Sequence, residues 1–418
     1  MTIKTICIVE PLASVNYLAT RLKEEGFNII AIVIHNNFAS NSPIAKKILA
    51  KKVLIKYELW DKVINFDYQH DNLQELAIQL AKLKVNYIYY GCEYVVPFTD
   101  QLNVIYASKN GNNPKTSLNR YDKFAMQEVL RQNNLLIPRQ AIINKNISPL
   151  ELERITDIIK FPLIIKPNNL AGSIGVYKID NQQRLLDTLI KETEIDQFVA
   201  QEFIVGDEYI VDTFSLNGRH SICQIGLYKK EFFHDDILYR YMLYIAPSEP
   251  IYTLISEYII KVLDTTELNN GFAHTELFVT QAQKLYLVEI NPRISGASGF
   301  LNLIAKQCGG NDQVDLLKNA VNNLPITPYP QNKNGMIVFI YNFNPKRIYN
   351  GLQLDLITSL PSYFYHAENI ALGTKLKVGG DLGDTICFIG LVHEDKKQLE
   401  KDYVKLIEYE KNDFLLKL

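Results

Sequence analysis

The sequence predicts an α/β protein of more than one domain, and three observations support this fold class. Strand-like and helix-like patterns alternate through the first hundred residues, as in parallel sheets with helices on their faces. The middle of the chain is rich in strands separated by short turns. Finally, 418 residues that are 47% apolar and 22% charged suffice for two or three domains, each with its own core.

The first part of the chain alternates apolar strands with amphipathic helices. We expect strands at 3–9, 28–34, 53–55 and 85–90, and helices at 15–25 and 72–83. No G-x-G-x-x-G follows any of these strands, so a dinucleotide-binding site is not supported. The turn-rich stretch from Asn110 to Pro114 is the predicted boundary, which makes 1–114 the first domain.

The second part begins with a helix and continues with strands. The predicted elements are a helix at 119–133 capped by Asn119, a strand at 139–143, a helix at 148–159, strands at 163–166, 175–179, 198–204 and 208–216, a helix at 252–264 and a hairpin at 272–291. After about residue 320, prolines and glycines separate short strands that lead to a charged terminal helix.

The overall composition excludes several classes of protein. The formal net charge is −2, without the basic surplus of a nucleic-acid-binding protein. No run of about 18 apolar residues suggests a membrane span, and the charge at Glu10 interrupts any signal-peptide core. Five widely spaced cysteines without a C-x-x-C suit reduced thiols. We therefore expect a cytoplasmic protein without nucleic-acid or membrane partners. A homodimer is left open.

Two acidic residues stand out in the stretch HTELFVTQAQKLYLVEINPR, residues 274–293. If the hairpin turns at Ala282-Gln283, Glu276 lies directly across from Glu289, with side-chain roots about 5 Å apart. Burying two facing carboxylates without a partner would cost several kcal/mol. A divalent cation removes that conflict, and Asn291 supplies a third oxygen ligand. The alternative is that both glutamates lie at solvated strand ends.

A lysine and a glycine-rich tip occur in FPLIIKPNNLAGSIGVYKI, residues 161–179. Lys166 ends an apolar strand, and Gly172, Ser173 and Gly175 follow in a loop whose backbone N–H groups could face an anion. No Walker A sequence is present. An ordinary hairpin turn is the alternative. Lys123, near the start of its helix, is by itself more typical of a solvated side chain.

The stretch FVAQEFIVGDEYI, residues 198–210, breaks at Gly206 between two strands. Such a break can present backbone groups to the edge of an adenine, and a carboxylate a few residues later can hold ribose hydroxyls. An ordinary acidic turn is the alternative.

Taken in order, these segments resemble an ATP-grasp ligase. The resemblance rests on YDKFAMQEVL, PLIIKP, AGSIGV, QEFIVGDEY, HTELFVT and LYLVEINPR, and it is greatest for the bacterial L-amino-acid ligase branch. It implies an ATP-grasp domain at 115–320, with a smaller lobe at about 115–200 and a larger lobe from about 201. It also implies a parallel-sheet domain at 1–114 and a C-terminal α+β subdomain at 321–418 that completes the larger lobe.

The resemblance also implies roles for individual residues. Implied nucleotide-binding residues are Lys123, Lys166, Gly172, Ser173, Gly175, Gln201, Glu202, Phe203, Ile204 and Glu208. Glu276, Glu289 and Asn291 would hold Mg²⁺, two ions being expected and Mn²⁺ a possible substitute. Arg293 would stabilise an acyl phosphate and a tetrahedral intermediate, and His274 would help to place a substrate.

The implied reaction is ATP-dependent joining of a carboxylate and an amine, with amino acids or similar small molecules as substrates. Two residues depart from the family pattern. Ile174 replaces a polar loop residue and Asn113 replaces an aspartate, and both changes bear on specificity or loop closure. A purine-type or carboxylase-type ligase and a nucleotide-binding regulator without turnover remain alternatives.

Overall fold

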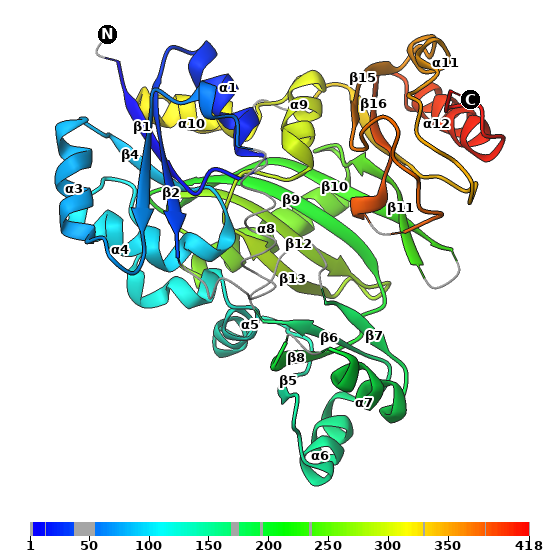
Figure 1. Ribbon diagram of the computed structural model, residues 1–418, viewed down its shortest axis with the longest axis horizontal. Coiled ribbons are helices and arrows are strands. Elements are labelled where there is room, and N and C mark those ends of the chain that lie inside the picture. The colour runs from blue at the N-terminus through cyan, green and yellow to red at the C-terminus, as the bar shows by residue number, and fades with distance from the viewer. Residues whose placement is uncertain are drawn as a thin grey trace.

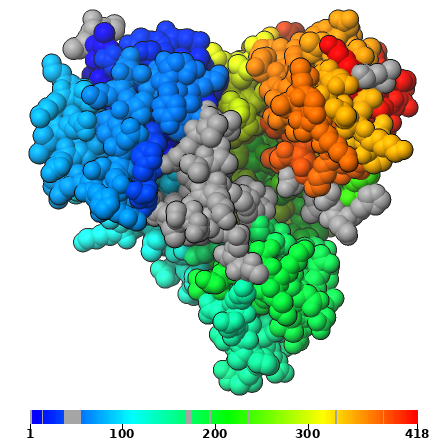
Figure 2. Space-filling view, in the orientation of Figure 1, coloured from blue at the N-terminus to red at the C-terminus, as the bar shows by residue number. Residues whose placement is uncertain are grey.

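A computed structural model describes residues 3–12, 14–36, 55–168, 175–192, 195–233, 236–328, 331–380 and 382–417. Within these residues the strands form three sheets, with helices against them (Figure 1). In the space-filling view a blue lobe, an orange-to-red lobe and a lower cyan-to-green lobe are visible, and the second sheet belongs to the lower lobe (Figure 2). The predicted α/β fold class is confirmed.

The first sheet is parallel, with strand order β3-β2-β1-β4. Its strands are β1 (Thr5–Val9), β2 (Asn28–His35), β3 (Lys62–Asp67) and β4 (Tyr87–Tyr90). The helices of this part are α1 (Val15–Glu24), η1 (Tyr57–Leu59), α3 (Leu73–Lys82), η2 (Glu93–Val95) and α4 (Val96–Tyr106). β1 is buried along its whole length because helices and the large sheet cover it.

Two elements of the first part differ from the prediction. Residue 55 is coil, and the rest of the predicted strand 53–55 lies outside the described residues. The third strand is instead β3. Its apolar pattern is weak in the sequence because this edge strand carries polar side chains between its apolar ones. Helix α4 was also missed, since its buried residues include polar ones such as Asp100 that blur the apolar stripe.

The second sheet is antiparallel, with order β5-β8-β6-β7. Its strands are β5 (Gln140–Asn144), β6 (Leu163–Pro167), β7 (Tyr177–Ile179) and β8 (Gln197–Glu202). Helices α6 (Pro149–Ile159) and α7 (Gln182–Lys191) share its apolar core. Before it come η3 (Pro114–Arg120) and α5 (Lys123–Gln132). α5 begins later than predicted because Asp122, rather than Asn119, caps it by accepting from Ala125 N.

The third sheet has eight strands in the order β13-β12-β9-β10-β11-β14-β16-β15. Its strands are β9 (Asp207–Leu216), β10 (Arg219–Phe233), β11 (Asp236–Tyr244), β12 (Gly271–Val279), β13 (Leu285–Asn291), β14 (Asn334–Ile340), β15 (Tyr363–Glu368) and β16 (Cys387–His393). Its helices are α8 (Pro250–Thr265), η4 (Ala297–Gly299), α9 (Phe300–Gln307), α10 (Gln313–Val321), α11 (Leu354–Thr358), η5 (Leu382–Asp384) and α12 (Lys396–Lys411).

The large sheet joins segments far apart in the sequence. β14 pairs with β11, so strands beyond residue 321 continue the sheet that contains the predicted metal hairpin. The domain boundaries at 114 and 320 remain predictions. No helix within the described ranges combines the length and the apolar composition needed to cross a bilayer.

Candidate functional site

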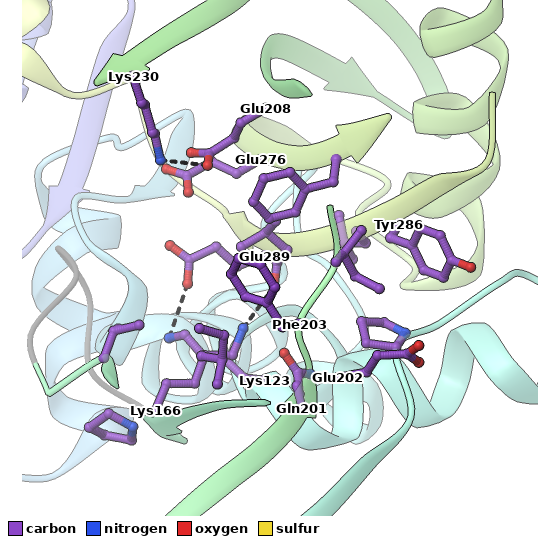
Figure 3. Close-up of a pocket in the computed structure, with 18 of the residues that line it drawn as sticks. Lys123, Lys166, Gln201, Glu202, Phe203, Glu208, Lys230, Glu276, Tyr286 and Glu289 are labelled. Atoms are coloured by element: carbon purple, nitrogen blue, oxygen red, sulfur yellow. Dashed lines mark hydrogen bonds and ion pairs between the residues drawn. The ribbon is translucent and has the colours of Figure 1, made fainter. Parts of the chain in front are cut away.

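A cavity of about 230 Å³ lies between the second sheet and the large sheet (Figure 3). Strands β6 and β8 supply one wall, while β9, β10, β11, β12 and β13 supply the other. The lining residues are Lys123, Pro138, Ile164, Lys166, Pro167, Val176, Gln201, Glu202, Phe203, Ile204, Glu208, Lys230, Tyr239, Glu276, Phe278, Tyr286, Leu287, Val288 and Glu289. The cavity thus joins cationic and acidic side chains over apolar walls.

The two predicted carboxylates face each other across the hairpin. Glu276 on β12 pairs with Glu289 on β13, and His274 pairs with Asn291, as the sequence analysis expected. Nearer the turn the expected register is wrong by one residue: Phe278 pairs with Tyr286 rather than Leu287. A bulge between Leu287 and Glu289 restores the predicted pairing at the carboxylates.

The register differs near the turn because the loop has three residues instead of two. Thr280 N donates to Lys284 O, which closes the loop around residues 281–283. Gln283 has φ +56°, and Gln283 N donates to Thr280 O. A tight turn followed by a left-handed residue is the usual three-residue hairpin loop, but without a glycine the sequence did not reveal it.

Glu289 is held by two partners inside the cavity. Lys123 Nζ lies 3.1 Å from Glu289 Oε2, and Asn291 Nδ2 donates to Glu289 Oε1 at 3.0 Å. Burial alone would raise the pKa of Glu289, but Lys123 and Lys166 outweigh it and lower this pKa to about 2. Glu289 therefore stays ionised at neutral pH.

Lys166 is the most deeply buried cation of the cavity. Its Nζ donates to Val288 O at 3.5 Å, so it points across from β6 to the bulge of β13. Burial and the nearby charge of Lys123 lower the pKa of Lys166 to about 8, although Glu289 and Glu276 oppose them. Its charge is therefore poorly compensated, as expected of a group that receives an anion.

A second ion pair crosses the acidic wall. Lys230 Nζ donates to Glu208 Oε2 at 2.5 Å and lies 4.1 Å from the ring centroid of Tyr239. Burial raises the pKa of Glu208; Lys230 opposes this shift and Glu276 adds to it. Figure 3 shows Lys230 reaching down toward Glu208 and Glu276, on the side opposite Lys123.

His274 stands beside the carboxylate pair without lining the cavity. His274 Nδ1 lies 2.6 Å from Asp212 Oδ1, and its Nε2 lies 3.6 Å from Glu276 Oε1. Burial lowers the pKa of His274, but Asp212 and Glu276 outweigh it and raise this pKa to about 9. The charged imidazole therefore bridges two carboxylates and orients Glu276.

Arg293 lies just beyond the hairpin and contacts the first sheet's part of the chain. Its Nε donates to Glu93 Oε1 at 2.5 Å, and its Nη1 donates to Ile294 O at 2.9 Å. Glu93 belongs to η2, which directly follows β4. The structure therefore places Arg293 near the metal ligands by sequence, but outside the lining of the cavity.

The sequence analysis singled out nine of the nineteen lining residues, including every charged one except Lys230. Gln201, Glu202, Phe203, Ile204 and Glu208 line the cavity. Gly172, Ser173 and the family departure Ile174 lie outside the described residues, while Gly175 has a φ of +70° that favours glycine.

Among the residues of the site that were not singled out as functional, four have side chains that can be charged or can form hydrogen bonds. These are Lys230, Tyr239, Tyr286 and Asp212. Asp212 carried a usable signal, because an acid within the apolar strand YIVDTF needs a buried partner. The sequence around Lys230 gave no signal of a functional role, because one lysine of a Lys-Lys pair on a strand is ordinarily solvated.

The donor set suits a hard divalent cation. Glu276 and Glu289 offer carboxylate oxygens from opposite strands, and Asn291, whose amide nitrogen is engaged by Glu289, offers an amide oxygen. No group of three or more His, Cys, Asp or Glu in the described ranges could hold a metal by itself. Two carboxylates and one amide therefore leave coordination positions for oxygens of another molecule.

Comparison with known proteins agrees with this geometry. Residues 159–300 match the family model described as "ATP-grasp domain". The chain contains an ATP-grasp domain. The crystal structure of the L-amino acid ligase from Bacillus licheniformis has a TM-score of 0.72 to this chain, covering 99% of this chain and 98% of that one at 17% identity. This likeness shows that the two chains share their fold over nearly their whole lengths.

Two curated relatives are similar in sequence. Dapdiamide A synthase of Enterobacter agglomerans is 24% identical over 262 residues, which cover 60% of this chain and 60% of the relative. The D-alanine–D-alanine ligase of Petrotoga mobilis is 27% identical over 188 residues, which cover 43% of this chain and 59% of the relative. The chain thus matches about three fifths of each relative's length.

Proposed function

We propose that this ATP-grasp protein is an ATP-dependent carboxylate–amine ligase. It joins amino acids or similar small substrates through an acyl phosphate and releases ADP and phosphate. The names of the relatives, an L-amino acid ligase, a dapdiamide synthase and a D-alanine–D-alanine ligase, support this class. A cytoplasmic location and a homodimer stay predictions.

One observation carries the proposal. The carboxylates Glu276 and Glu289 face each other in a cleft that also holds Lys123 and the poorly compensated Lys166. Facing acids suit a cation, while buried lysines suit an anion, and a metal-bound nucleoside triphosphate brings both charges together. Such a site acts mainly by positioning and by neutralising charge, which requires no protein nucleophile.

Each residue then has a defined task. Lys123 and Lys166 bind phosphate oxygens, and Lys123 exchanges its contact with Glu289 for the nucleotide. Residues 201–204 line the base, while Glu208 leaves Lys230 to accept ribose hydroxyls. Glu276, Glu289 and Asn291 would hold Mg²⁺, which supplies compensation of the phosphate charge. Arg293 and His274 keep their proposed roles next to the acyl group, from outside the nucleotide cavity.

The decisive experiment measures phosphate and ADP release with pairs of amino acids, followed by mass spectrometry of the product. The proposal requires release that depends on both a carboxylate and an amine, with a product that has lost one water. Release that depends on bicarbonate would support a carboxylase-type or purine-type ligase instead. Tight ATP binding without release for any substrate pair would support a nucleotide-binding regulator.

A further inference from the structure

Gln201 lies on the cavity wall where the proposed function places the nucleotide base, and its amide can present either an acceptor or a donor. Gln201 on β8 pairs directly with Gln140 on β5. Its Nε2 donates to Gln140 Oε1 at 3.0 Å. Figure 3 shows Gln201 reaching into the cavity from the strand below Lys123. Which of its two amide atoms faces a ligand depends on what orients Gln140.

Gln140 is oriented by two groups that only accept hydrogen bonds. Its Nε2 donates to Phe124 O at 3.1 Å and to Glu128 Oε1 at 3.0 Å. Glu128 is fixed as a carboxylate acceptor because Arg131 binds its other oxygen, at 2.8 and 3.0 Å. Reversing the Gln140 amide would set its oxygen against two acceptors, so the hydrogen-bond network determines the orientation.

The orientation passes from Gln140 to Gln201. Because Gln140 Oε1 can only accept, Gln201 must turn its nitrogen toward it, which directs Gln201 Oε1 away from Gln140. Within the described part of the chain, this oxygen accepts no hydrogen bond from the protein, although Gln201 is almost completely buried. A ligand that donates a hydrogen bond there satisfies the oxygen. A ligand that presents an acceptor instead leaves two acceptors facing each other, which costs binding free energy.

We propose that Gln140 is a positioning residue that fixes Gln201 as an acceptor, so that the cavity selects a purine with a 6-amino group over one with a 6-oxo group. The inference rests on the proposed nucleotide site and adds base selection to it. Adenine donates from its 6-amino group, whereas hypoxanthine and guanine present an oxygen there. Sites that hydrogen-bond a substrate group discriminate strongly against analogues that leave the buried partner unsatisfied.

The test compares binding of ATP and ITP, which lacks the extra amino group of guanine and differs from ATP in its 6-oxo group and in the N1–H that accompanies it. We expect the wild-type protein to bind ATP at least about 10-fold more tightly than ITP in calorimetric titrations. Gln140→Met keeps the side-chain length but removes all three hydrogen bonds of the Gln140 amide, which frees Gln201 to reverse. The ratio of the two dissociation constants should then fall by at least about 3-fold.

A matched control comes from the same pair of strands. Gln197 Nε2 donates to Asn144 Oδ1 at 3.0 Å, at the far end of the β5–β8 pair and outside the cavity lining. Asn144→Leu should leave the ATP-to-ITP ratio unchanged. An equal fall in Asn144→Leu and Gln140→Met would overturn the inference, because the effect would then come from loosening the strands.

A double-mutant cycle separates positioning from general structure. Gln201→Met should lower the ratio by itself as far as Gln140→Met does, and adding Gln140→Met should change the ratio no further. If Gln140→Met does not fold, Gln201→Met still tests the acceptor, and an unchanged ratio in it would refute base selection by Gln201. Wild-type protein that binds neither nucleotide would overturn the proposed function, whereas ATP binding with a ratio insensitive to Gln140→Met would overturn this inference alone.

Discussion

At the residue scale, the cavity balances acids against bases in pairs. Glu289 pairs with Lys123, Glu208 pairs with Lys230, and Glu276 lies beside His274. Buried charges are tolerated only when they are compensated, so each pair lowers the cost of holding the site ready without a ligand. The positive charge of Lys166 is the least compensated of these, and its lowered pKa is consistent with this. A nucleotide and its cation would replace these internal partners.

Glu289→Gln tests the acidic half of the cavity. The substitution keeps the shape but removes a charge that pairs with Lys123, so we expect an intact fold and turnover reduced by at least about 100-fold. Circular dichroism and phosphate release would measure the two effects. Glu231→Gln is the control, because this carboxylate is 60% exposed on β10 and should leave turnover unchanged. Wild-type turnover in Glu289→Gln would remove the site assignment.

The pH dependence of nucleotide binding tests Lys166. In the free protein its pKa is about 8, and a phosphate beside the ammonium group would raise this pKa. Binding therefore takes up a proton above pH 8, and ATP affinity should fall by up to about 10-fold between pH 7 and pH 9. Calorimetry in buffers of different ionisation enthalpy would detect the proton uptake. Lys166→Arg stays charged throughout and should lose this dependence; if it keeps the dependence, another group is responsible.

At the scale of the element, the β12–β13 hairpin sets the distance between the two carboxylates, and α5 covers its free edge. Gln127 Nε2 donates to Leu287 O at 2.8 Å, and Lys123, one turn earlier on the same helix, reaches Glu289. From α8, Tyr258 OH accepts from Leu287 N at 2.9 Å. Side chains thus satisfy the backbone where the bulge interrupts the ladder, which keeps the facing acids in register.

The three-residue loop of this hairpin gives a prediction about stability. Gln283 has φ +56°, a conformation that disfavours a residue with a Cβ atom, and its side chain is exposed. Gln283→Gly should therefore raise the free energy of unfolding by about 0.5–1 kcal/mol without altering turnover. Thermal and urea denaturation would measure this. Gln281→Gly, at a position without positive φ, should not stabilise; equal stabilisation by both changes would contradict the explanation.

At the scale of the whole molecule, the segment between the first two sheets contacts both the first sheet's part of the chain and the large sheet's part. Asn112 donates to Tyr90 OH at 2.7 Å and to Asn270 O at 2.9 Å. Arg120, fully buried, binds Asp100 of α4 at 2.7 Å and Thr266 O at 3.0 Å. These contacts join the first sheet to the large one, and the Arg293–Glu93 ion pair joins them again beside the site.

Asp100→Ala tests these contacts. Removing the carboxylate leaves the Arg120 guanidinium buried without its charge partner, so we expect a loss of about 3–5 kcal/mol in the free energy of unfolding. Urea denaturation followed by fluorescence would measure it. Asp157→Ala removes an exposed i,i+3 pair with Lys160 and should cost less than about 0.5 kcal/mol. Similar losses for the two variants would show that Arg120 does not depend on Asp100.

Glu276 and Glu289 face each other as expected only because a bulge offsets the three-residue loop. The sequence by itself determined the α/β class and the approximate course of most elements. These features depend on local periodicity, and a strand alternates its faces whatever surrounds it. Resemblance in the order of several short motifs then pointed to Lys123, Lys166 and the 201–208 segment. Of these, Lys123, Lys166, residues 201–204 and Glu208 line the cavity.

Only the tertiary structure decided which side chains of the site interact with one another. The three-residue loop, the cap of α5 by Asp122, and β10 and β11 were not read from the sequence, because packing selected them over weak local signals. Three side-chain contacts of the site join residues that are 22 to 62 positions apart in the sequence: Lys230 with Glu208, Asp212 with His274, and Gln140 with Gln201. Periodicity places a side chain on a face, but charge and hydrogen bonding act between faces that only the folded chain brings together.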